Sequence, residues 1–396
     1  MARVLIAWEF GGDLGHVRRI VPIARELRAM GHEVCLAFRN SAFIDLARAE
    51  GFDTFIAPLH HAPAQMSPSP LNFSDLLLNL GFHDPRGVAG ALRAWRSMFD
   101  LLAPDVLVAD YSPTALIAAN LARIPVVTIG TGFSVPPFRD PLPDLRPWSP
   151  TDPKVLRALD DRLLDSVRRA TGGSGTAIPG RACELFEASA NLLCTFHEID
   201  PFSPRDGVEY VGPQGDASSG ARVDWAGHNR RRVFAYLKPR RNRFEAVLSG
   251  LAALDAEVIV AAPGLDGERA AAASTASMRV FPEAINLDPL LPEASLCVSH
   301  AGPGLAARAM AAGVPMALLP LQLEQFLVAT RIESSGAAIV SNPERPAPDY
   351  REWFGDFLAS ESAREAAHVL GERHRGHDFG QAIRRAAGRI ADFVAH

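Results

Sequence analysis

Residues 3–38 read RVLIAWEFGGDLGHVRRIVPIARELRAMGHEVCLAF, and this stretch decides the fold of the first half of the chain. Val4 to Ala7 form a short apolar run, which is typical of a parallel strand buried on both faces. A glycine-rich turn follows at residues 11–16, and Val34 to Phe38 form the next apolar run. Between them, apolar residues recur at spacings of three and four and predict an amphipathic helix: Ile20, Ile23, Leu27 and Met30. Strand, helix and strand in this order indicate one unit of a doubly wound parallel sheet.

The same alternation continues along the chain and restarts after a polar, glycine-containing stretch. The apolar runs predict further strands at residues 105–109, 126–129, 233–237, 257–261, 296–299 and 315–319. The intervening patterns predict helices at residues 114–122, 242–254 and 304–312, one from about 324, and one at about 379–395. We therefore expect an α/β protein with two Rossmann-like doubly wound domains that face each other across a cleft.

The restart of the pattern also predicts the domain boundaries. We expect an N-terminal domain at 1–212, a linker at 213–227 and a C-terminal domain at 228–378. The helix of residues 379–396 is expected to pack back toward the N-terminal domain. Two long irregular stretches, 58–75 and 133–153, interrupt the first domain and are candidate binding loops, with disordered surface excursions as the alternative.

Composition excludes several classes of protein. With 48% hydrophobic residues, the 396-residue chain has ample apolar material for packed cores, so it is not a disordered chain. Its net charge of −5 does not suggest nucleic acid as a partner. Four cysteines without a CxxC pair favour buried free thiols in a reducing cytosol: Cys35, Cys183, Cys194 and Cys297. Because we find neither a signal peptide nor a membrane-spanning run, we expect a soluble cytoplasmic protein.

The turn at residues 299–304, Ser-His-Ala-Gly-Pro-Gly, joins a predicted strand to a predicted helix. A helix N-terminus presents free N–H groups and the positive end of the helix dipole, which suits a phosphate. His300 follows the strand and would add a further donor. Tight packing is the alternative explanation for the two glycines, Gly302 and Gly304.

The surroundings of this turn carry a family resemblance. From Leu290 to Ala338 the sequence closely resembles the donor-binding signature of family 1 glycosyltransferases of the GT-B fold. The matching motifs are Leu290-Leu291-Pro292, His300-Ala301-Gly302, Gly313-Val314-Pro315, and Pro320 with Glu324-Gln325. Gly15-His16-Val17 with Pro22, Gly31-His32-Glu33-Val34 and Tyr210-Val211-Gly212-Pro213 also resemble sequences of that family. The resemblance spans most of the chain.

The resemblance implies that the domain at 1–212 binds the acceptor and that the domain at 228–378 binds the nucleotide-sugar donor. It also implies roles for residues of the first domain. His16 matches the general base that deprotonates the acceptor hydroxyl, a task that suits imidazole because it ordinarily titrates near neutral pH. Asp110 matches the acid that orients this base and stabilises its cationic form. The alternatives are an ordinary loop histidine at position 16 and a helix N-cap at position 110.

In the second domain, His300, Gly302 and Gly304 match the diphosphate site, and Glu324 and Gln325 match the pair that hydrogen-bonds the donor sugar. The alternative for Glu324 and Gln325 is a solvated helix start.

The sequence departs from the family pattern at three positions. Leu305 stands where a Ser or Thr usually contacts phosphate, and Arg308 stands where many members carry a Glu that holds the ribose. Lys238 replaces the usual Gly-Ser turn near the phosphates, and we expect it to be a donor-site residue. Whether Leu305 and Arg308 change donor use is left open.

We therefore predict an inverting glycosyltransferase that moves a sugar from a UDP- or dTDP-sugar to a hydroxyl of a hydrophobic small molecule or lipid. The nucleotide sugar is a co-substrate, and neither a cofactor nor a metal is expected. A lipid acceptor would allow peripheral contact with a membrane. Apolar residues of the first domain suggest this acceptor class, with core packing as the alternative for several of them: Phe73, Leu76, Leu77, Phe82, Phe133, Phe138 and Trp148.

Three other functions were weighed. A non-catalytic nucleotide-sugar-binding protein would explain the three departures, and a sugar-nucleotide epimerase would share the architecture. An NAD-dependent Rossmann enzyme requires G-x-G-x-x-G after the first strand, and the spacing of Gly11, Gly12 and Gly15 does not supply it. The sugar, the acceptor and the oligomeric state are not predicted.

Overall fold

The computed structural model describes residues 1–12, 14–62, 69–172, 178–215, 220–227, 230–239 and 243–394. The chain forms two compact units. Unit 1 comprises Met1–Thr195, Pro204–Gln214 and Gly380–His396, and unit 2 comprises Phe196–Ser203 and Gly215–Phe379. A short segment from the first half of the chain, 196–203, therefore belongs to unit 2.

Unit 1 is built on a parallel sheet of seven strands in the order β3-β2-β1-β4-β5-β6-β7. The strands are β1 (Arg3–Trp8), β2 (Glu33–Phe38), β3 (Asp53–Ile56), β4 (Val106–Asp110), β5 (Val126–Gly130), β6 (Ala190–Leu193) and β7 (Glu209–Tyr210). The strand order reverses between β1 and β4. In open parallel sheets ligands bind at the carboxyl ends of the strands at this point.

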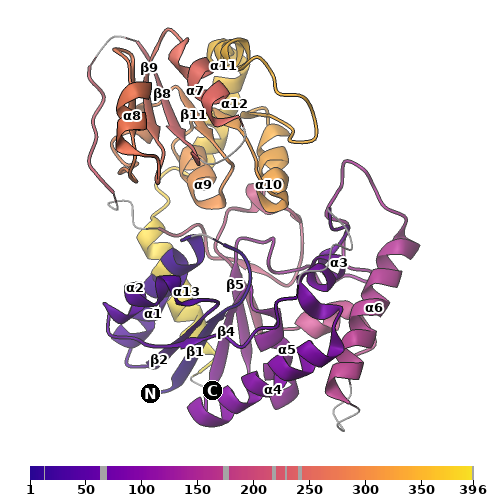
Figure 1. Ribbon diagram of the computed structural model, residues 1–396. Helices are drawn as coiled ribbons and strands as arrows, with labels where there is room; N and C mark the ends of the chain where they lie inside the picture. Colours follow the sequence, from indigo (N-terminus) through magenta and orange to yellow (C-terminus); the bar gives the residue numbers. More distant parts are fainter. Residues whose placement is uncertain are drawn as a thin grey trace. The chain divides into compact units, whose positions relative to one another are not determined.

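The helices of unit 1 cover both faces of the sheet. They are α1 (Gly15–Ala29), α2 (Ile44–Arg48), α3 (Phe73–Leu77), α4 (Pro85–Leu102), α5 (Pro113–Ala122), α6 (Pro153–Thr171) and the C-terminal α13 (Phe379–Asp392). Shorter helical turns lie at Ser41–Phe43, Leu78–Phe82 and Ala182–Phe186. Figure 1 shows α1, α2 and α13 on one side of this sheet and α4 and α5 on the other. Ile20 and Ile23 of α1 and Ile390 of α13 are fully buried in one cluster with the strands.

Unit 2 repeats the architecture with six parallel strands in the order β10-β9-β8-β11-β12-β13. The strands are β8 (Arg231–Tyr236), β9 (Ala256–Ala261), β10 (Met278–Phe281), β11 (Leu296–Ser299), β12 (Met316–Leu318) and β13 (Ala338–Val340). The helices are α7 (Phe244–Ala252), α8 (Gly267–Ala273), α9 (Pro303–Ala311), α10 (Leu323–Glu333), α11 (Tyr350–Ala359) and α12 (Glu361–Arg373). Helical turns lie at His197–Ile199 and Leu291–Glu293. Separate apolar clusters, one holding α7 and α11 and the other α9, α10 and α12, complete the core.

These two parallel-sheet α/β domains confirm the predicted fold class. The predicted loop at 58–75 is partly wrong, because α3 begins at Phe73 with the Asn72 side chain accepting a hydrogen bond from the Asp75 backbone N–H. Residues 63–68 of that stretch lie outside the described residues, whereas 133–152 is irregular as predicted. All four cysteines are buried and unpaired with one another. No helix among the described residues is long and apolar enough to cross a membrane.

Candidate active site

The two predicted catalytic residues of unit 1 lie together at the point where the strand order reverses. Asp110 ends β4, where it lies in register with Trp8 of β1. His16 is the second residue of α1, and its Nδ1 lies 3.1 Å from Oδ1 of Asp110. The Trp8 ring stacks on the imidazole with centroids 5.0 Å apart. Since an ionised carboxylate only accepts hydrogen bonds, Nδ1–H donates to Asp110, which leaves the lone pair on Nε2.

The glycine turn before α1 makes room for this imidazole. Gly11 has a φ of +82°, and a Cβ at this position would lie 2.4 Å from Nε2 of His16. Both the left-handed backbone and the close approach of the ring require glycine here. The carbonyl of Gly11 accepts a hydrogen bond from the Arg39 guanidinium, which holds the turn against the segment after β2.

Asp110 is fully buried and has two basic neighbours, Arg19 and His16. Burial by itself raises the pKa of Asp110, but the charges of Arg19 and His16 outweigh burial and leave this pKa below its ordinary value. Nε of Arg19 lies 3.6 Å from Oδ2, and the Arg19 side chain is only 10% exposed. The carboxylate is therefore ionised at neutral pH, as a group that orients an imidazole must be.

The alternative role of Asp110 as a helix N-cap is wrong, because another acid performs it. Glu9, directly after β1, accepts hydrogen bonds from the backbone N–H groups of Thr114 at 2.8 Å and Ala115 at 3.0 Å, in the first turn of α5. It also accepts one from Nε1 of Trp95 at 2.6 Å. Burial raises the pKa of Glu9 to about 8 even though these hydrogen bonds lower it. The sequence analysis missed Glu9, whose only signal is an acid at the end of an apolar strand.

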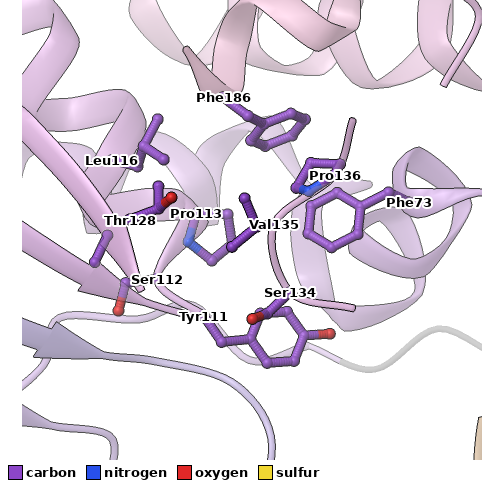
Figure 2. Close-up of a pocket in the computed structure, with 11 residues that line it drawn as sticks. Phe73, Tyr111, Ser112, Pro113, Leu116, Thr128, Ser134, Val135, Pro136 and Phe186 are labelled. Atoms are coloured by element: carbon purple, nitrogen blue, oxygen red, sulfur yellow. The ribbon is translucent and has the colours of Figure 1, made fainter. Parts of the chain in front are cut away.

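An apolar pocket begins directly after Asp110. Figure 2 shows the rings of Phe73, Tyr111 and Phe186 around it. The rest of the lining comes from Ala109, Ser112, Pro113, Leu116, Thr128, Ser134, Val135 and Pro136. The cavity measures about 20 Å³, roughly the room of one water molecule. Tyr111 has a left-handed φ of +48°, and such strain in a residue other than glycine is frequent at functional sites.

Only some of the apolar residues expected to contact an acceptor lie at this pocket. Phe73 lines it, and Phe133 contacts Tyr111 edge to face with ring centroids 6.3 Å apart. Phe138 and Trp148 are exposed on the surface. The remaining expected residues do not line the pocket: Leu76, Leu77, Phe82, Phe138 and Trp148. For Leu77 and Phe82, both buried, the core-packing alternative fits better.

In unit 2 the strand order reverses between β8 and β11, and Lys238 and His300 follow these two strands. Nε2 of His300 accepts a hydrogen bond from the backbone N–H of Lys238 at 2.9 Å. Nδ1 lies 2.8 Å from the carbonyl oxygen of Leu319, to which it donates. The imidazole thus holds the ends of β8, β11 and β12 together, with both ring nitrogens bonded to the backbone. Because both ring nitrogens are used in this way, the donors that this turn can offer to a phosphate are the backbone N–H groups at the start of the following helix.

That helix, α9, begins with the glycine turn. Gly302 is its N-cap with φ −60° and ψ 128°, a conformation open to any residue. A Cβ added to Gly302 or Gly304 would meet nothing within 4 Å. Tight packing, the alternative explanation for these glycines, is therefore wrong. Glycines that neither the backbone nor the packing requires leave room for a ligand to approach the helix N-terminus.

A cavity of about 350 Å³ opens beside His300 at the carboxyl edge of the sheet. Its lining includes two cationic side chains, Lys238 and Arg243, together with Ser341 and Tyr350. The remaining lining residues are Leu237, Phe244, Val247, His300, Leu319, Pro320, Leu321 and Pro343. Nη2 of Arg243 donates to the carbonyl of Arg345 at 2.9 Å. Lys238 was predicted as a donor-site residue, whereas Arg243 was not.

The predicted sugar-binding pair lies in the first turn of α10. Gln325 is buried, and its Oε1 accepts a hydrogen bond from the backbone N–H of Leu321 at 2.8 Å. The alternative of a solvated helix start is therefore wrong for Gln325. Glu324 is half-buried beside it. The Gln325 side chain thus shapes the turn after β12, and any contact with a sugar would come from its amide nitrogen.

The two departures on α9 have structural partners. Leu305 packs against the apolar core of unit 2. Arg308 forms an ion pair with Asp288 at 3.5 Å, and its guanidinium lies over the ring of Phe379 at 4.3 Å from the centroid. Leu305 therefore contributes to packing. Arg308 holds the carboxylate of Asp288 near the position where many family members carry a Glu.

Comparison with known proteins agrees with this geometry. Residues 245–375 match the family described as erythromycin biosynthesis protein CIII-like, C-terminal domain. A PGL/p-HBAD biosynthesis glycosyltransferase of Mycobacterium tuberculosis is 25% identical over 370 residues, which cover 87% of this chain and 81% of that protein.

Two solved structures share the fold over the whole chain. The calicheamicin glycosyltransferase CalG4 aligns with a TM-score of 0.73 and 20% identity, covering 100% of this chain and 98% of that one. The glycosyltransferase VinC in complex with DTDP aligns with a TM-score of 0.70 and 18% identity, covering 99% of both chains. The resemblance seen in the sequence is thereby confirmed, and with it the assignment as an enzyme. The chain is a glycosyltransferase of the GT-B fold.

Proposed function

We propose that this glycosyltransferase transfers the sugar of a nucleoside diphosphate sugar to a hydroxyl group of a hydrophobic acceptor, with inversion at the anomeric carbon. The observation that carries the proposal is the hydrogen bond between His16 and the buried Asp110 beside the apolar pocket. Nε2 of His16 takes the proton of the acceptor hydroxyl. The acceptor oxygen then bonds to the anomeric carbon as the bond from that carbon to the diphosphate breaks. One displacement of this kind inverts the configuration.

The arrangement around His16 supports its role as the base. The bond from Nδ1–H to Asp110 fixes the tautomer that leaves Nε2 able to accept a proton. Stacking on Trp8 holds the plane of the ring. The buried carboxylate stabilises the imidazolium that forms when the proton is taken up. A base oriented in this way contributes about 10²–10⁴-fold to a rate.

Unit 2 supports binding of the nucleoside diphosphate. The open N-terminus of α9 offers backbone donors, and the neighbouring cavity carries the cations Lys238 and Arg243. Together they suit the negative charge that collects on the leaving diphosphate. The complex of VinC with DTDP supports a dTDP-sugar as the donor, with a UDP-sugar as the alternative. Glu324 and the amide nitrogen of Gln325 would bind the sugar hydroxyls.

The pocket beside Asp110 supports the proposed acceptor class. Its rings and aliphatic side chains suit an apolar, ring-containing molecule that carries a hydroxyl group. A cavity of about 20 Å³ is too small for such a molecule, so binding must move the segment that carries Ser134, Val135 and Pro136. This segment belongs to the irregular stretch 133–153, which the sequence analysis selected as a binding loop.

The test is transfer by the purified full-length chain from dTDP-glucose or UDP-glucose to 4-methylumbelliferone or 1-dodecanol. We expect His16→Ala to lose at least about 100-fold in turnover, as for removal of a positioned base, while dTDP binding is unchanged. His32→Ala, which lies beyond the other end of α1, is the matched control and should retain turnover. NMR of the glucoside should show a β-anomer. Turnover of His16→Ala above a third of the wild-type value, or an α-anomer, would contradict the proposal.

A further inference from the structure

Two basic side chains of α1 reach the same carboxylate. His16 and Arg19 are three residues apart and therefore lie on one face of the helix. His16 approaches Oδ1 of Asp110 at 3.1 Å, and Nε of Arg19 approaches Oδ2 at 3.6 Å. Each carboxylate oxygen thus has its own basic neighbour on α1. The proposed mechanism uses only the first of them.

The three side chains are shielded from water. Asp110 is unexposed, and the side chains of Arg19 and His16 are 10% and 14% exposed. The ionisable groups near them include Tyr111 after β4, Cys194 after β6 and Arg39 after β2, which binds the Gly11 carbonyl. Burial raises the pKa of the Cys194 thiol to about 12, so this group stays neutral.

We infer that Arg19 is a positioning residue that fixes Oδ2 of Asp110 and sets the pH at which His16 becomes able to act as a base. The inference rests on the proposed function of His16. A guanidinium keeps its charge at every accessible pH, so it offsets the charge of Asp110 permanently. The imidazolium that forms on His16 then faces one negative and one positive charge rather than an unopposed carboxylate.

With Arg19 present, the pair of His16 and Asp110 therefore gives up its proton more readily than it would without Arg19. Without Arg19, the carboxylate would be uncompensated in a buried site, and the pair of His16 and Asp110 would keep its proton to higher pH. This holds whichever of the two carries the proton, because closely interacting groups titrate as a pair. A nearby charge within about 4–6 Å typically shifts a titration by about 1–3 pH units.

NMR titration of the full-length chain tests the inference without any substrate. The Cε1–H resonance of His16 is identified as the one absent from His16→Ala, and its midpoint is compared in Arg19→Gln and Arg18→Gln. Arg18 is the exposed neighbour on α1 and serves as the matched loss of one positive charge. We expect Arg19→Gln to raise the midpoint by about one pH unit, and Arg18→Gln to leave it within about 0.2 of the wild type.

Two further variants keep the test decisive. Arg19→Met fills the same half-buried space without a charge and replaces Arg19→Gln if that variant does not fold. Arg19→Lys restores the charge and should return the midpoint toward the wild-type value. Equal midpoints in the Arg19 and Arg18 variants would overturn the inference. The proposed function fails separately, if His16→Ala keeps its turnover, because the NMR midpoint does not depend on catalysis.

Discussion

At the scale of single residues, the buried acids of unit 1 have opposite electrostatic surroundings. Asp110 faces Arg19 and His16 and has a lowered pKa, whereas Glu9 faces only neutral donors and has its pKa raised to about 8 by burial. Asp110 thus stays ionised and can accept the hydrogen bond from His16. Glu9, which connects β1 with Trp95 and α5, carries a proton near neutral pH in the folded protein and none in the unfolded chain.

This difference predicts how stability depends on pH. Between the ordinary pKa of 4.5 and about 8, folded Glu9 holds a proton that the unfolded chain lacks, so the free energy of unfolding falls as pH rises. The contribution of this one group approaches about 1.4 kcal/mol per pH unit. In thermal melts from pH 5 to 8, the melting temperature of Glu9→Gln should decline less than that of the wild type. Parallel declines would show that Glu9 is ionised throughout this range.

The glycines at the start of α9 give a second residue-scale prediction. Gly302→Ala should fold normally, because its backbone suits alanine and the added methyl meets nothing within 4 Å. The methyl would occupy space next to a bound phosphate, so dTDP binding should weaken about tenfold, or ~1.4 kcal/mol, in calorimetric titration. Gly267→Ala, at the start of α8 and equally open, is the control. Unchanged affinity in Gly302→Ala would place the phosphates elsewhere.

At the scale of elements, close packing of α12 against the end of α9 depends on two glycines. A Cβ on Gly371 would lie 2.7 Å from Cα and 2.8 Å from N of Gly313, backbone atoms that cannot move without shifting the helix. Both residues lie outside the binding site. Their role is to let the helix that carries Gly302 and Gly304 rest directly on α12 and keep its N-terminus at the sheet edge.

Two glycine substitutions in different helices should therefore have opposite signs. Gly371→Ala is expected to lower the free energy of unfolding by about 1–3 kcal/mol, as for an overpacked site. Gly388→Ala in α13, where a Cβ meets nothing within 4 Å, should raise it by about 0.5–1 kcal/mol through a better helix propensity. Denaturant melts of both variants provide the measurement. A stabilised Gly371→Ala would mean that α12 can move away from α9 at little cost.

At the scale of the whole molecule, the end of the chain returns to unit 1. Ile390 of α13 is fully buried in the core that α1 forms with the strands, and Nε of Arg389 lies 2.7 Å from a carboxylate oxygen of Glu209. Unit 1 therefore includes α13, which is separated from the rest of that unit in the sequence by unit 2. Unit 2 has its own core around Phe354, which is fully buried between α11 and the sheet.

Separate cores predict separate effects of core mutations. Ile390→Ala should destabilise unit 1 by about 2–5 kcal/mol, and Phe354→Ala should destabilise unit 2 by about 3–5 kcal/mol. Calorimetry with added dTDP distinguishes the two, because the ligand should raise the transition of the unit that binds it. Val369→Ala, at an exposed position, is the control. If both core variants lowered one common transition, the two units would unfold as a single cooperative body.

Much of this protein is determined by local sequence. Strand and helix periods, the glycine turns before α1 and α9, and the positions of His16 and Asp110 at strand or helix ends can all be predicted, because each depends on neighbours within a few residues. The doubly wound fold follows from the repeated alternation of these elements. So does the expectation that the carboxyl ends of the strands carry the chemistry.

Only the tertiary structure decided which distant groups share a site. Arg19 and Asp110 are 91 positions apart in the sequence, Glu9 caps a helix more than 100 residues away, and the two nitrogens of His300 bind the ends of two other strands. None of these contacts has a periodic or local signal, because each arises when parallel strands bring remote loops to one edge of a sheet. The sequence therefore could not predict the charge balance around His16 and Asp110, although it did predict both residues as members of one site.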